Sequence, residues 1–444
     1  HAAVCSGSPA NGSFTDYQYD SAHRLIRVDD SRGYTLDNAG NMPQTNWANP
    51  DASVAHSQRF AFNTLGRLQH LIETRNGEDV STLRGYDANG NRTSDAGGSH
   101  TYTPHTNRPA SVAGQAVSVD AAGNVTQLRN LGFVWNQAGY LAEVRQGTPA
   151  GPLLATYDYD HKGRRARKST TAAAPQGATT TLYLYDHADR LLVEADGAGN
   201  PRITYVWRED TPIALIRHGT PETVLYLETD HLNTPRAARN QAGQVVWRWE
   251  SDAFGSTAAN EDPAGTGTST TVNLRFPGQY FDKESGLFYN WNRYYDPTIG
   301  RYISPDPIGL DGGLNLFGYA NQNPLRYSDP TGEAATLSWC LGGPIACAAG
   351  VGSLILMSPP GQKTLKSAGK AIADLCNGND DDDKPDCRKA SKWDLVQAGI
   401  LDEHAYKREN GAVPESRYDI CKCKDGTIRI AAVGMCGKTS DFWH

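Results

Sequence analysis

Short runs of alternating apolar and polar residues recur along residues 1–272, and each run is bounded by a turn. In the run TYVWR the aromatic residues Tyr205 and Trp207 fall on one face, opposite the polar residues at its two ends. A period of two puts every second side chain on the same face of an extended strand. The pattern therefore predicts a succession of β-strands joined as hairpins.

The turns between these runs repeat a pattern of an aromatic residue, then Asp or Asn, then Gly. Examples are YDANGNRTS from Tyr86, WNQAGYLAEV from Trp135 and YDHKGRRARKS from Tyr159. The Asp or Asn side chain accepts backbone N–H groups in a turn, and Gly adopts the left-handed conformation. A single hairpin is marginally stable in water, so neighbouring hairpins have to stack to form a core. We expect a mainly β fold, a curved shell of stacked hairpins over residues 1–272.

The sequence pattern changes over residues 273–333. This segment contains the run FPGQYFDKESGLFYNWNRYYDPTIGRYISPDPIGL and closes with NPLRYSDPTG. A further characteristic run, DHLNTPRAARNQAGQVVWRWESDAFG, lies upstream and starts at Asp230. This text resembles the core of the Rhs/YD-repeat polymorphic toxins, which is also found in the C components of insecticidal Tc toxins. The resemblance implies a YD-repeat shell that encloses a C-terminal toxin. It also implies that this sequence is the C-terminal part of a longer protein.

Two Asp-Pro-x-Gly phrases begin at Asp306 and Asp329. Such a phrase on its own is typical of a turn, because Pro fixes φ and Gly permits the reversal. The resemblance instead implies an aspartyl-protease-like pair that cuts the chain after the second phrase. When two carboxyl groups lie close together, one keeps its proton and the other can activate water. We expect Arg301 to hold a carboxylate or the oxyanion. The expected cut lies after Glu333, where the family commonly has Leu.

Residues 334–388 begin with an apolar, small-residue-rich stretch, residues 337–357, and end with the acidic run NGNDDDDKPD. The apolar stretch is near the minimum length of a membrane span, but a buried linker helix is the alternative reading. The acidic run is typical of a solvated linker, and its spacing is not that of an EF-hand calcium loop.

Residues 389–444 are the predicted toxin domain, a small α+β unit. One or two short helices precede a hairpin around Lys424-Asp425-Gly426. This order resembles small nuclease toxins of the barnase/colicin-type RNase class. Metal-independent RNA cleavage needs an acid, a base and cations for the phosphate. The candidate residues in the tail are His404, Lys407, Glu409, Ser416, Arg417, Lys438 and Thr439. Each of them is alternatively a solvated surface residue.

Composition narrows these readings only a little. The formal net charge of -7 with 20% charged residues points neither to nucleic acid nor to a membrane. Seven of the eight cysteines stand in the last quarter of the chain, which suits disulfides or a metal site. We predict no cofactor and no metal in the catalytic sites.

Three functions compete: a released RNase, a membrane-active tail, and a structural YD-repeat surface protein without an enzymatic tail. The polar N-terminus shows no signal peptide, so we expect delivery into a target cell, or secretion, by another route. The expected partners are a cognate immunity protein, the secretion machinery, RNA, and a membrane contacted by residues 337–357.

Overall fold

The computed structural model describes residues 2–6, 13–20, 25–28, 32–37, 41–48, 54–75, 77–337, 387–389, 418–423 and 428–432. The chain divides into two compact units, residues 1–343 and residues 344–444. In the described part of the first unit nearly all regular structure is β-strand, and each strand pairs antiparallel with its neighbour in sequence. The predicted mainly β fold of successive hairpins is confirmed there.

Two large sheets carry most of the repeats. The first has eight strands: β1 (Ala2–Ser6), β2 (Ser13–Tyr19), β3 (Leu25–Val28), β4 (Arg32–Thr35), β5 (Gln44–Ala48), β6 (Val54–Phe62), β7 (Leu68–Arg75) and β8 (Glu78–Leu83). The second has thirteen strands: β15 (Ser118–Val119), β16 (Val125–Leu128), β17 (Leu131–Trp135), β18 (Leu141–Gln146), β19 (Leu153–Tyr159), β20 (Arg165–Thr170), β21 (Thr179–Tyr185), β22 (Leu191–Asp196), β23 (Pro201–Arg208), β24 (Thr211–Arg217), β25 (Thr223–Thr229), β26 (Pro235–Arg239) and β27 (Val245–Arg248).

Smaller sheets complete the first unit. Two three-stranded sheets lie between the large ones in sequence: β9 (Gly85–Tyr86), β10 (Arg92–Asp95) and β11 (Gly98–Ser99), then β12 (Thr101–Tyr102), β13 (Pro109–Val112) and β14 (Gln115–Ala116). After the second large sheet come β28 (Tyr280–Asp282), β29 (Leu287–Asn290), β30 (Arg293–Asp296) and β31 (Arg301–Tyr302), the 3-10 helices η1 (Gly309–Gly312) and η2 (Ala320–Gln322), and the paired strands β32 (Tyr327–Ser328) and β33 (Thr336–Leu337).

The repeat aromatics join each hairpin to the one before it. The hydroxyl of Tyr159 donates to the carbonyl of Leu141 at 2.6 Å, and that of Tyr185 donates to Arg165 at 2.9 Å. The indole of Trp207 donates to a carbonyl of the preceding strand in the same way. A buried polar group needs such a partner. The aromatic residue therefore supplies both apolar area and a fixed spacing between neighbouring strands.

The turns have the expected chemistry. In the turn after β19 the Asp160 carboxylate accepts the N–H groups of Lys162 and Arg164 at 2.9 Å each, and Gly163 has φ +75°. Two turns place other residues at the left-handed position, Asp189 and Asn233, both with φ near +63°. Asn and Asp tolerate this conformation better than other side chains. The repeat therefore persists where its glycine is missing.

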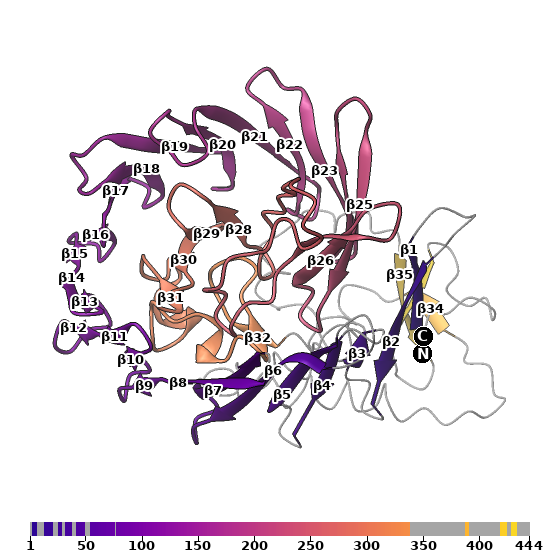
Figure 1. Cartoon of the computed structure of the whole chain (residues 1–444), viewed down its shortest axis with the longest axis horizontal. Coiled ribbons are helices and arrows are strands. Elements are labelled where there is room, and N and C mark those ends of the chain that lie inside the picture. The colour runs from indigo at the N-terminus through magenta and orange to yellow at the C-terminus, as the bar shows by residue number, and fades with distance from the viewer. Residues whose placement is uncertain are drawn as a thin grey trace. The chain divides into compact units, whose positions relative to one another are not determined.

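The strands β28–β31 lie on the inner side of β15–β27, which follow one another around them (Figure 1). Buried charges join the two layers. Arg165 on β20 pairs with Asp282 at 2.5 Å, with side chains 1% and 0% exposed, and Lys168 reaches the same carboxylate at 2.9 Å. Four tyrosine rings surround the Arg165 guanidinium. The inner layer is therefore held by both aromatic packing and ion pairs.

The segment after β27 packs against the first large sheet. Gln58 on β6 donates to the Ser251 carbonyl at 3.2 Å, and Arg84 pairs with Asp252 at 3.1 Å. The Phe254 ring lies beneath the guanidinium groups of Arg84 and Arg92. Contacts between residues so distant in sequence bring the early and the late repeats together.

The second unit is described only in its strands. β34 (Cys387–Lys389), β35 (Tyr418–Cys423) and β36 (Ile428–Ala432) form an antiparallel sheet, with Ile420 opposite Ile430. The predicted helices, the acidic run and nearly all of the apolar stretch 337–357 lie outside the described residues. Within the described ranges no helix is both long enough and apolar enough to cross a bilayer.

Replacing Arg165 by Met is expected to lower the free energy of unfolding by about 3–5 kcal/mol, because Asp282 loses its closest cation while buried. Arg167→Met is the matched control on the same strand. Its partner is Asp158 and both side chains are 53% exposed, so the change should stay within about 0.5 kcal/mol. Urea unfolding of both variants followed by tryptophan fluorescence measures the difference. Equal losses of unfolding free energy in the two variants would contradict a larger contribution of the buried ion pair to stability.

Candidate active site

A hairpin of the inner layer carries the centre of the site. β29 and β30 pair through Asn290 and Arg293, and the side chains of both strands are buried. After β31 the chain makes a loop and returns, so that the Asp306 N–H donates to the Leu316 carbonyl at 2.8 Å. It then continues through β32 to Asp329. This path brings three segments of the chain to one place.

Arg293 lies between the two aspartates that the sequence singles out. Its Nη2 is 2.9 Å from Asp306 Oδ2 and 3.0 Å from Asp329 Oδ2, and all three side chains are at most 3% exposed. The phenol of Tyr302 donates to the same Asp329 oxygen at 2.8 Å. The carboxyl groups therefore meet through one shared guanidinium.

Burial sets the protonation of this group. It raises the pKa of Asp306 to about 6, although the positive charge of Arg293 acts in the opposite direction. Burial also raises the pKa of Tyr302 well above its ordinary value, so the phenol stays protonated as a donor. The site therefore holds a carboxyl group that titrates near neutrality.

The segment from Asp329 to Ala334 is fixed from both sides. Asn290 donates to the Asp329 carbonyl at 2.8 Å, and Asn292 donates to the Thr331 carbonyl at 3.1 Å. The Nε of Arg293 donates to the carbonyl of Gly332. Within the segment, Asp329 Oδ1 accepts the N–H of Glu333 at 3.0 Å and that of Ala334 at 3.2 Å.

The peptide bond between Glu333 and Ala334 consequently lies beside both aspartates. Its N–H points to Asp329, and its carbonyl oxygen borders Gly312 together with the carboxyl group of Asp306. Two residues later the chain enters β33, where Thr336 pairs with Ser328 of β32. The chain thus bends through the site, with Gly332 at φ +73°, and becomes a strand only at Thr336.

Arg301, the cation expected from the sequence, has other partners. Its Nη2 donates to the Asn107 carbonyl at 2.6 Å, and the guanidinium lies over the rings of Tyr102 and Phe317. The cation that contacts both carboxylates is Arg293. The tail candidates lie outside the described residues: His404, Lys407, Glu409, Ser416, Arg417, Lys438 and Thr439.

Sequence reasoning missed Arg293, Tyr302 and Asn290. One signal for Arg293 was present, because it interrupts the aromatic run FYNWNRYYD. A cation inside a run that has to be buried needs an acidic partner from elsewhere in the chain. The pattern did not identify that partner, because Asp306 and Asp329 follow in separate loops.

Known protein families and relatives show which family the chain belongs to. The family model for the teneurin YD-shell matches residues 35–324. The chain belongs to the Rhs/YD-repeat shell family. Double-stranded DNA deaminase toxin A of Burkholderia cenocepacia (strain H111) is 31% identical over 336 residues, which cover 70% of this chain and 23% of that protein. The tRNA nuclease WapA of Bacillus subtilis (strain 168) is 28% identical and covers 60% of this chain and 12% of that protein.

Among solved structures, the crystal structure of TcdB2-TccC3-TEV has a TM-score of 0.55 at 20% identity and covers 72% of this chain and 18% of that chain. That likeness supports the YD-shell fold. This chain spans about a quarter or less of the length of the deaminase toxin and of WapA.

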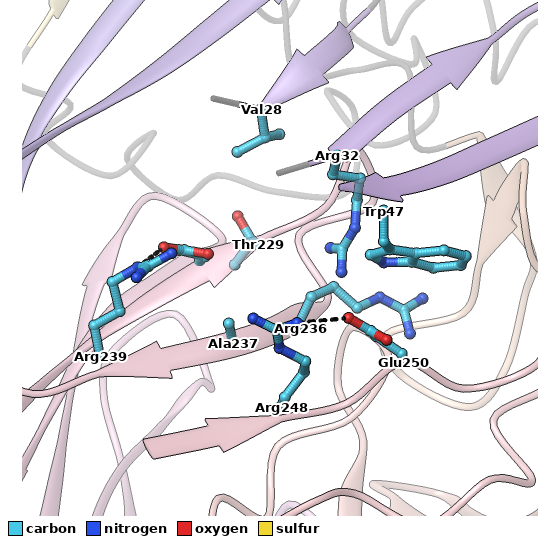
Figure 2. Close-up of a pocket in the computed structure, with 10 residues that line it drawn as sticks. Val28, Arg32, Trp47, Thr229, Arg236, Ala237, Arg239, Arg248 and Glu250 are labelled. Carbon is cyan, nitrogen blue, oxygen red and sulfur yellow. Dashed lines mark hydrogen bonds and ion pairs between the residues drawn. The ribbon is translucent and has the colours of Figure 1, made fainter. Parts of the chain in front are cut away.

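A pocket elsewhere in this YD-shell chain is lined by strands of both large sheets (Figure 2). Its arginines are used within the fold: Arg239 pairs with Glu228, Arg236 with Asp230, and Arg248 with Glu250. Arg32 lies over the Trp47 ring. The arginines that line this pocket therefore pair with acidic residues of the fold, between early and late repeats.

Arg293→Met is expected to lower the free energy of unfolding by about 3–5 kcal/mol, because two buried carboxyl groups lose their shared cation. Adding Asp306→Asn and Asp329→Asn to this variant should restore part of the loss, since no uncompensated charge then remains. Denaturant unfolding of the single and triple variants tests this. A triple variant that is less stable than the single variant would contradict the electrostatic explanation.

Proposed function

We propose that this chain is the C-terminal part of an Rhs-type toxin that hydrolyses its own backbone between Glu333 and Ala334 and so releases the residues that follow. The observation that supports this most directly is the position of that peptide bond, beside two aspartates that share one buried arginine. The relatives include a deaminase toxin and a tRNA nuclease, which supports the toxin class.

The two aspartates take different roles in this mechanism. Asp306 is the protonated one, because burial raises its pKa and its carboxyl group is next to the Glu333 carbonyl. It donates a hydrogen bond that polarises the carbonyl. Asp329 is the base that takes a proton from the attacking water. Asp329 also contacts the Ala334 nitrogen, so it can pass that proton to the leaving amine.

The step balances as a hydrolysis. The water oxygen bonds to the Glu333 carbonyl carbon, the C–N bond to Ala334 breaks, and the two protons of water end on the products. The products are a carboxyl group at Glu333 and an amino group at Ala334. Arg293 is the cation that fixes the aspartates and, through Gly332, the chain that they cut. Preorganised charge of this kind is a main source of enzymatic rate enhancement.

Asp306→Asn and Asp329→Asn are each expected to leave the chain whole, with at least about a 100-fold slower cut, because each removes an acid or a base. Asp311→Asn is the matched control, an exposed acid in the same loop, and should cut like the parent. Intact mass of the purified chains reads the result. A parent chain without a break after Glu333 would refute the proposed function.

The rate of self-cleavage should fall as the pH rises through about 6, because the reactive form carries a proton on Asp306. Time courses of the chain made by cell-free synthesis, moved into buffers on either side of that value, measure the profile. A rate that rises through the same range would reverse the assigned roles.

We also propose that residues 389–444 are the toxin and that they cleave RNA without a metal. The name of WapA as a tRNA nuclease favours this over a membrane-active tail and over a structural protein without an enzymatic tail. His404 would be the acid or base, and the cations would bind phosphate. An immunity protein that covers this site, the secretion machinery, and delivery into a target cell complete the proposal.

Expression of residues 334–444 should be toxic, and His404→Ala should abolish toxicity and RNA cleavage by removing a proton-transfer group. Leu354→Asp tests the membrane-active alternative, because a charge in an apolar span opposes insertion. Survival of cells and the integrity of their RNA are the measurements. Loss of toxicity with Leu354→Asp alone would support the membrane-active tail, and a harmless parent tail would support the structural protein.

A further inference from the structure

We infer that Gly312 is a positioning residue for self-cleavage, because it leaves open the space in which the Asp306 carboxyl group and the Glu333 carbonyl face each other. The inference rests on the proposed function and names a further residue of the same site. Gly312 ends η1, in the loop that follows Asp306.

The space at Gly312 is already filled by the reacting groups. A Cβ atom built on this residue would lie 2.3 Å from Asp306 Oδ2, 2.7 Å from Asp306 Cγ and 2.4 Å from the carbonyl oxygen of Glu333. Real Cβ atoms essentially never approach other atoms so closely. Any side chain here would occupy the place where the acid meets the carbonyl to be cut.

Neither neighbour is free to move aside. The Asp306 carboxyl group is held by Arg293 at 2.9 Å and by the N–H of Ile308 at 3.1 Å. The Glu333 carbonyl is part of the backbone, and the N–H of the same residue donates to Asp329 Oδ1 at 3.0 Å. Relief of the clash therefore needs the acid and the carbonyl to separate.

Backbone conformation does not explain the glycine. Gly309 and Gly313 in the same loop have φ of +62° and +133°, which disfavours other residues, and both have open space around the Cβ position. Gly312 is the reverse case, since its φ lies outside the left-handed region and only its surroundings exclude a side chain. The requirement at this position thus comes from the site.

The size of the expected effect follows from geometry. Displacing a reacting group by about 1 Å can cost about 100-fold in rate, because hydrogen bonds to a developing charge are sensitive to distance. Gly312→Ala should therefore slow self-cleavage by about 100-fold. The Asp306 carboxyl group stays buried, and burial is what raises its pKa, so residual cleavage should still fall as the pH rises through about 6.

The control variant has to introduce a Cβ atom into an equally crowded position that lies outside the candidate site. Gly132 on β17 has no left-handed φ, and a Cβ there would lie 2.0 Å from the backbone of Thr148. Gly132→Ala therefore adds the same methyl group to an equally tight place among the repeats. Cleavage followed by intact mass, and thermal midpoints of both variants in an Asp329→Asn background, separate rate from stability.

The expected result is slow cleavage for Gly312→Ala and parental cleavage for Gly132→Ala. Equal rates for the two variants would overturn the inference, as would a pH midpoint that moves down toward the ordinary carboxyl range, which would mean that the loop had opened. If the parent chain stays whole, the proposed function fails and the inference with it. If the parent is cut and Gly312→Ala is cut as fast, only the inference fails.

Discussion

The buried guanidinium of Arg293 is the interaction on which the site depends. An isolated carboxylate in a protein interior is strongly unfavourable, and two of them side by side more so. A single Nη2 within 3.0 Å of both Asp306 and Asp329 compensates this cost. The same side chain binds the Gly332 carbonyl, so the cation that makes the pair tolerable also fixes the chain beside it.

Such an arrangement needs rigid surroundings. The inner strands are held against the repeats by the ion pairs of Arg165 and Lys168 with Asp282, and by the ring contacts of Tyr157 with Tyr294 and of Tyr183 with Tyr280. The repeats are in turn spaced by hydrogen bonds from their aromatic residues to the preceding strand. The YD-repeat strands therefore support the inner strands that carry the site.

The site also shows two separate reasons for glycine in one short loop. At Gly309 and Gly313 the backbone has positive φ, which is a local property and can be suspected from a turn pattern. At Gly312 the neighbours Asp306 and Glu333 exclude a side chain, which is a property of the assembled fold. Only the second kind reports which groups from distant segments meet in the folded chain.

The sequence by itself determined the elements that depend on local interactions. Period-two alternation and the aromatic-Asp-Gly turns predicted the hairpins, because strand alternation and turn chemistry are set by residues close together in the chain. The two Asp-Pro-x-Gly phrases by themselves predicted turns, and it was the family resemblance that made Asp306 and Asp329 candidates. The left-handed backbone conformation of the glycines in the repeat turns was predicted for the same local reason.

Tertiary structure alone decided which cation serves the aspartates. Arg301 and Arg293 are both arginines near aromatic residues, and their spacing in sequence does not distinguish them. The fold turns Arg301 toward Asn107 and Arg293 toward Asp306 and Asp329, since the partner of a buried charge is fixed by contacts between distant segments. The role of Gly312 was hidden for the same physical reason, because the atoms that fill its space come from elsewhere in the chain.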